Sequence, residues 1–142
     1  MSLPKTTREY RLPKMDGFHN LTLQGATIPQ LKSDEVLLKV HAVSLQYRDL
    51  AIAKGQYLPG VKANVVPGSD MAGEIVAVGA AVAGWQVGER VMPNFSLGHV
   101  FGEPTVEGGK TALGGPVDGV LTEYKVVPAH ALVRIPKHLS YT

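Results

Sequence analysis

The chain has 142 residues, of which 44% are hydrophobic and 18% charged, and its formal net charge is +2. This length is about that of one domain, and the composition favours a globular protein over a disordered one. The basic residues are scattered and no apolar run approaches the roughly 20 residues that span a bilayer, so we expect neither a nucleic-acid partner nor a membrane partner. The first residues lack the apolar core of a signal peptide, and we expect a cytoplasmic protein.

The first half of the chain predicts strands and one short helix. The clearest strand is 35–45, where both faces are apolar and burial within a barrel is expected. Residues 48–54 are helix formers followed by Gly55, as at a helix C-terminus. The other strands expected in this half are 6–12, 21–23 and 71–78.

The second half contains a long segment without periodicity. Residues 94–119 include seven glycines, and we interpret them as an excursion from the barrel. A long strand is expected at 120–127 and a short one at 132–135. Sixteen glycines and ten prolines in the whole chain suit a barrel with many tight connections.

The sequence contains no cysteine, which excludes disulfides, thiol nucleophiles and thiolate zinc sites. The five histidines share no metal-ligand spacing. His99, in the glycine-rich excursion, is the histidine that could reach a substrate cleft.

Two short segments carry a resemblance to a known family. Gln46-Tyr47-Arg48-Asp49 follows the strand at 35–45, and Gly68-Ser69-Asp70 opens the next strand. This order resembles the catalytic domain of the medium-chain dehydrogenase/reductase superfamily, whose fold is a GroES-like β barrel. In the zinc alcohol dehydrogenases of that superfamily, a Cys stands three residues before the Asp and a His follows the Gly. Gln46 and Ser69 hold those positions here, so the resemblance points to the zinc-independent branch, typified by NADPH-dependent quinone oxidoreductases.

The resemblance implies a mainly-β fold: a GroES-like, partly open barrel with one or two short helices, in which residues 1–142 form the catalytic domain and 94–119 a lobe-like insertion. The family's Rossmann domain would follow, because no glycine-rich phosphate loop occurs in this sequence. The implied cofactor is NADP or NAD, bound mainly by that domain, without zinc. A domain-sized piece of a longer enzyme is therefore expected, with a natural stand-alone domain as the rival interpretation.

The resemblance also implies site residues. Gln46 and Tyr57 would border the nicotinamide and the substrate, as catalytic candidates: the Gln46 amide could orient a carbonyl group, and the Tyr57 phenol could donate to a developing oxyanion. Tyr47 and Arg48 would join them in contacting the cofactor, although Arg48 could instead form an ion pair. Tyr57 could alternatively cap a hydrophobic edge. We expect Asp49 to be structural, accepting hydrogen bonds at the start of the helix.

The function that this implies is NAD(P)H-dependent, metal-independent reduction of a quinone, enone or other carbonyl substrate. The full-length protein could be a homodimer, and the chain alone is expected to be inactive. One alternative is a non-catalytic GroES-like barrel for assembly or partner binding, for which the apolar residues of 94–119 would form the mobile loop. Another is an alcohol dehydrogenase-like enzyme, which would use zinc.

Overall fold

The computed structural model describes residues 3–142, which form two sheets and two short α-helices. The strands are β1 (Thr6–Arg11), β2 (Thr22–Thr27), β3 (Glu35–Ser44), β4 (Asp70–Val78), β5 (Arg90–Pro93), β6 (Tyr124–Pro128) and β7 (Leu132–Arg134). The α-helices are α1 (Tyr47–Ala53) and α2 (Val106–Gly109), and 3-10 turns span Phe18–Asn20 and Ala129–Ala131. Within this part of the chain, no helix combines the length and the apolar character needed to cross a membrane.

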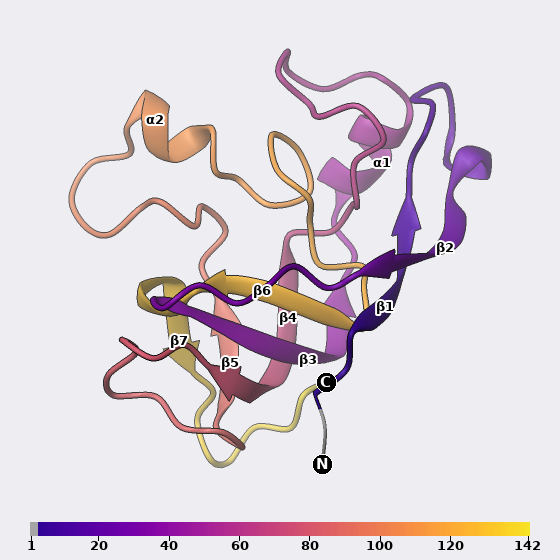
Figure 1. Ribbon diagram of the computed structural model, residues 1–142. Coiled ribbons are helices and arrows are strands. Elements are labelled where there is room, and N and C mark those ends of the chain that lie inside the picture. Colours follow the sequence, from indigo (N-terminus) through magenta and orange to yellow (C-terminus); the bar gives the residue numbers. More distant parts are fainter. Residues whose placement is uncertain (1–2) are drawn as a thin grey trace.

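The larger sheet has five antiparallel strands in the order β6-β3-β4-β5-β7, and β1 pairs with β2 in a separate sheet beside it (Figure 1). Backbone hydrogen bonds from the Tyr10 N–H to Leu121 and from the Glu123 N–H to Arg8 join β1 to the segment directly before β6. The sheets do not close on themselves. The expected mainly-β, partly open barrel with two short helices is therefore confirmed.

The main core lies against β3 and β4, because their inward side chains alternate with more exposed ones along much of each strand. Its buried members are Val36, Leu38, Met71, Ile75, Val91, Leu113, Val120, Val127 and Leu132. A second, smaller cluster beneath α1 holds Ile52 and Ala53 against Leu12 and Val65. This second cluster fixes the helix against the β1 side of the molecule.

The strand expected at 120–127 is shorter in the structure, where β6 begins only at Tyr124. The reason is a competing set of backbone bonds: Gly119, Val120 and Leu121 pair with Val66, Gly68 and Pro67 instead of with β3. The expectation failed for residues 120–123 because apolar alternation does not reveal which segment a backbone pairs with.

The glycine-rich segment 94–119 leaves the sheet after β5, carries α2 and returns before β6 (Figure 1). Its two halves meet where the Leu113 N–H donates to the Phe95 carbonyl at 3.0 Å and where Ser96 bridges Ala112. Leu113 is fully buried in the main core. The return half of this segment is thus part of the packed interior as well as of the excursion.

A charged cluster around Asp118 joins the excursion to β1 and β6. The Asp118 carboxylate accepts from Lys62 Nζ at 2.5 Å and from Arg11 Nη1 at 3.4 Å, and its backbone carbonyl accepts from Lys125 Nζ at 2.5 Å. The carboxylate also accepts from the Val66 N–H at 3.0 Å. These bonds hold the chain on either side of Gly119 in place.

Candidate functional site

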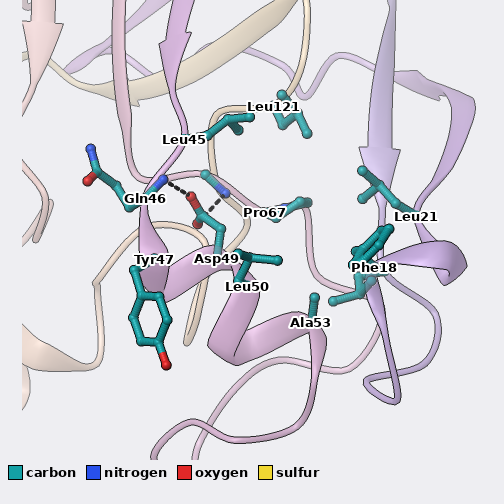
Figure 2. Close-up of a pocket in the computed structure, with 12 residues that line it drawn as sticks. Phe18, Leu21, Leu45, Gln46, Tyr47, Asp49, Leu50, Ala53, Pro67 and Leu121 are labelled. Atoms are coloured by element: carbon teal, nitrogen blue, oxygen red, sulfur yellow. Dashed lines mark hydrogen bonds between the residues drawn. The ribbon is translucent and has the colours of Figure 1, made fainter.

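The segment Gln46–Asp49 begins α1, and its backbone is fixed by the Asp49 side chain. One carboxylate oxygen accepts from the Gln46 N–H at 2.8 Å, and the other accepts from the Gly68 N–H at 3.3 Å (Figure 2). The first bond satisfies a donor at the helix start that has no partner within the helix. Asp49 has the structural role expected from the sequence, and it also joins the two segments that carry the family resemblance.

Beside this helix start lies a cavity of about 510 Å³. Its walls are mainly apolar, and its polar groups come from the first turn of α1 (Figure 2). The lining residues are Leu12, Phe18, Leu21, Leu45, Gln46, Tyr47, Asp49, Leu50, Ala53, Pro67, Gly68 and Leu121. A mainly apolar hollow with a few polar groups at one side is the usual form of a small-molecule site.

Gln46 lines this cavity at its polar side. Its side-chain Nε2 donates to the Ser44 hydroxyl at 2.9 Å. Figure 2 shows the amide directed away from Phe18 and Leu21, which lie across the cavity. Tyr47 also lines the cavity, and 83% of its surface is exposed. The structure therefore brings two of the expected site residues to one hollow.

Tyr57 and Arg48 form a second pair. Tyr57 is not among the residues that line this cavity, and its phenolic oxygen accepts from Arg48 Nε at 3.0 Å. Within residues 3–142, Gln46 and Tyr57 make no hydrogen bond with each other. The partner of Gln46 is Ser44, and the partner of Tyr57 is Arg48, which lies two residues after Gln46.

The residues at the zinc positions do not fit a zinc ion. Gln46 offers an amide that already bonds to Ser44, and Ser69 is buried with its hydroxyl donating to Asp70 Oδ2 at 2.5 Å. Neither side chain is a thiolate, an imidazole or a carboxylate, the groups that structural and catalytic zinc sites use. Among residues 3–142, no three His, Cys, Asp or Glu side chains gather closely enough to hold a metal ion.

His99 lines a different cavity from that of Gln46. This hollow lies within the excursion, where Phe95 and Asn94 also contribute to its walls. The expectation that His99 could reach the substrate cleft stays a prediction.

Sequence reasoning did not single out the residues on the wall of the Gln46 cavity opposite α1. Phe18 and Leu21 come from the connection between β1 and β2, and Leu121 from the segment before β6. Phe18 is 66% exposed, and other apolar residues that line this cavity are exposed too, but only the structure reveals this exposure. Their convergence depends on the pairing of β1 with residues 121–123, which no local pattern encodes.

Comparison with known proteins gives consistent matches. The family described as "Alcohol dehydrogenase GroES-like domain" matches residues 32–137. A zinc-type alcohol dehydrogenase-like protein of Schizosaccharomyces pombe is 46% identical over 129 residues, which are 90% of this chain and 37% of that protein. An NADPH-dependent alkenal/one oxidoreductase of Arabidopsis thaliana, a chloroplastic protein, is 31% identical over 147 residues, covering 99% of this chain and 34% of that protein.

A solved structure from Sinorhizobium meliloti 1021, provisionally named an alcohol dehydrogenase, superposes with a TM-score of 0.84 at 33% identity. The match covers 99% of this chain and 42% of that one. The chain thus spans roughly a third of the length of the curated relatives that it matches.

Proposed function

Because the chain belongs to the family of alcohol dehydrogenase GroES-like domains, we propose that it is the catalytic portion of an NAD(P)H-dependent, metal-independent oxidoreductase. The proposed substrates are quinones, enones or other carbonyl compounds. The observation that carries the metal-independent part is the pair Gln46 and Ser69 at the zinc positions, in a sequence without cysteine. The relative that acts with NADPH on alkenals and alkenones supports the cofactor and the substrate class.

The cavity beside α1 fits one end of such a cofactor. Apolar walls, which include Leu45 and Leu50, suit the flat face of a nicotinamide ring. Beyond its bond to Ser44, the Gln46 amide keeps one N–H donor and its carbonyl acceptor for a carboxamide. The sequence has no glycine-rich phosphate loop. Phosphate binding is therefore assigned to a further part of a longer protein, and the chain alone is expected to bind NADPH weakly.

When bound, a reduced nicotinamide cofactor would supply a hydride to the acceptor carbon. The chain's own task is to orient the acceptor and to stabilise the negative charge that develops on its oxygen, which in other enzymes is worth several kcal/mol. Tyr57 offers an O–H group for that oxygen. Gln46 holds the nicotinamide side of the cavity, and the apolar wall around Leu50 limits the access of water.

The test uses the protein encoded by the complete reading frame. We expect consumption of NADPH or NADH with a quinone or an enone as acceptor, and substoichiometric zinc by metal analysis. Stoichiometric zinc, with activity lost on chelation, would favour an alcohol dehydrogenase-like enzyme instead. The chain of residues 1–142 should show no turnover. Micromolar affinity of this chain for NADPH would contradict the proposal that another part of the protein binds most of the cofactor.

Native mass measurement tests the remaining proposals about assembly. A monomer or homodimer agrees with an enzyme that acts on small molecules, whereas a seven-membered ring would favour a non-catalytic assembly barrel. The proposed location is the cytoplasm, which imaging of the tagged complete protein would check.

A further inference from the structure

Arg48 joins three separate segments of the chain at one guanidinium group. Its Nε–H donates to the Tyr57 phenolic oxygen at 3.0 Å, and its Nη1 donates to the Leu113 carbonyl oxygen at 2.9 Å. Its Cζ lies 4.9 Å from the ring centroids of both Tyr57 and Phe95, within the range of cation–π attraction. The start of α1, the loop after it and both halves of the excursion therefore meet at this cation.

The excursion is shaped to admit the guanidinium. A Cβ atom at residue 115 would collide with Arg48 Nη2, so a larger residue there would displace the guanidinium from this position. The carbonyl that accepts from Arg48 belongs to Leu113, whose side chain is fully buried in the main core. The position of Arg48 is thus set by packed backbone rather than by mobile surface groups.

The direction of the bond at Tyr57 leaves the phenolic proton free. Arginine has only donors, so the Tyr57 oxygen must be the acceptor in this pair. A phenol has a single O–H, and within residues 3–142 Tyr57 donates to no other group. Tyr57 is 38% exposed. The O–H can therefore be donated to a ligand that reaches this surface.

We propose that Arg48 is a positioning residue for Tyr57, and that the pair forms the binding point for the carbonyl or enolate oxygen of the acceptor substrate. This inference rests on the function proposed above. The ligand oxygen accepts the Tyr57 proton in a hydrogen bond, and the guanidinium behind the phenol stabilises negative charge on that oxygen. The positive group is thus supplied by the first turn of α1, two residues from the position that holds a zinc ligand in related enzymes.

The test measures binding of 4-nitrophenolate, an oxyanion probe with an absorbance signal, to the 142-residue chain at a pH where the probe is ionised. We expect Tyr57→Phe to weaken binding about tenfold, as expected when a donor to a charged group is lost. Arg48→Met should cost about as much, and the double variant should lose little more, because Arg48 acts through Tyr57. Tyr10→Phe is the matched control, since Tyr10 is also 38% exposed, and it should bind as the wild type does.

Arg48→Lys keeps the proposal testable if Arg48→Met does not fold. Lysine retains the charge but lacks the fork that reaches both Tyr57 and the Leu113 carbonyl, so binding should still weaken. The proposal is overturned if the wild-type chain does not bind the probe, if Tyr57→Phe binds normally, or if the losses from the two single variants add fully.

The same variants separate this inference from the proposed function. If the variants lose probe binding but the complete wild-type protein shows no NAD(P)H-dependent reduction, the oxidoreductase is rejected and the oxyanion site stands. Reduction that is unchanged in kcat and KM by Arg48→Lys and Tyr57→Phe would reject the site and leave the oxidoreductase standing.

Discussion

The Asp49 carboxylate accepts a hydrogen bond from the backbone N–H of Gly68 at 3.3 Å. This bond spans 19 residues and connects the helix start at Gln46 with the turn that leads into β4. The same carboxylate accepts from the Gln46 N–H at 2.8 Å. One side chain therefore holds together the two segments that resemble the zinc-binding segments of related dehydrogenases.

Replacing Asp49 should destabilise the chain. Asp49→Ala removes both acceptors and leaves two backbone donors without their partner, which we expect to lower the free energy of unfolding by about 1–3 kcal/mol. Asn keeps one carbonyl acceptor, so Asp49→Asn should cost roughly half as much. Urea unfolding followed by circular dichroism measures both. Asp34→Ala is the control, because the exposed Asp34 side chain accepts no hydrogen bond from residues 3–142. An equal loss of stability in that variant would contradict the explanation.

Gly119 should tolerate no larger residue. A Cβ atom there would overlap the backbone carbonyl oxygens of Gly68 and Pro67, which belong to the segment that Gly119 pairs with. Gly119→Ala should therefore lower the free energy of unfolding by about 2–4 kcal/mol, as expected for overpacking against rigid backbone. Gly25→Ala in β2 is the matched control, because a Cβ atom there would meet no atom of residues 3–142 within 4 Å. The midpoint of thermal unfolding should be clearly lower for Gly119→Ala than for Gly25→Ala. Similar midpoints would show that the backbone around Gly68 can move to accommodate the added methyl group.

Lys125 should make stability depend on pH in the alkaline range. Burial lowers the pKa of Lys125 to about 8, from 10.5 in the unfolded chain. Between these two pH values the unfolded chain binds more protons than the folded chain does. The contribution of Lys125 therefore makes the free energy of unfolding rise with pH, by at most about 3 kcal/mol. Lys125→Met should lack this rise, whereas Lys39→Met, at an exposed position of β3, should keep it. Urea unfolding at several pH values from 7.5 upwards measures the slopes, and parallel slopes for wild type and Lys125→Met would contradict the prediction.

Gln46 should affect cofactor binding more than stability. Gln46→Leu keeps most of the side-chain volume but removes the amide, whose one bond within the structure is to the Ser44 hydroxyl at an exposed site. In the complete protein we expect KM for NADPH to rise about tenfold, the usual cost of one lost hydrogen bond in a binding site. Gln24→Leu, on the exposed strand β2, is the control. Unchanged cofactor kinetics in Gln46→Leu would remove Gln46 from the proposed site.

Local patterns predicted most of the elements but not how they pair. The alternation in β3 and β4 and the helix formers before Gly55 gave elements close to those observed, and Gly55 adopts the positive φ of 67° expected after a helix. Residues 120–123 were misassigned because Val120 and Leu121 pair with the segment at 66–68 and the next two residues pair with β1, both far away in sequence. Pairing across such distances depends on which partner the whole fold presents, and a local window cannot contain that information.

For the candidate site, too, sequence and tertiary structure determined different things. The sequence by itself determined the chemistry that is present: an amide at Gln46, a hydroxyl at Ser69, a phenol at Tyr57 and no thiolate anywhere. Only the tertiary structure decided the partners of these groups, placing Gln46 beside an apolar cavity and giving the Tyr57 oxygen to Arg48. The physical reason is that residue type fixes what a side chain can donate or accept, whereas direction and distance are set by packing between segments remote in the chain.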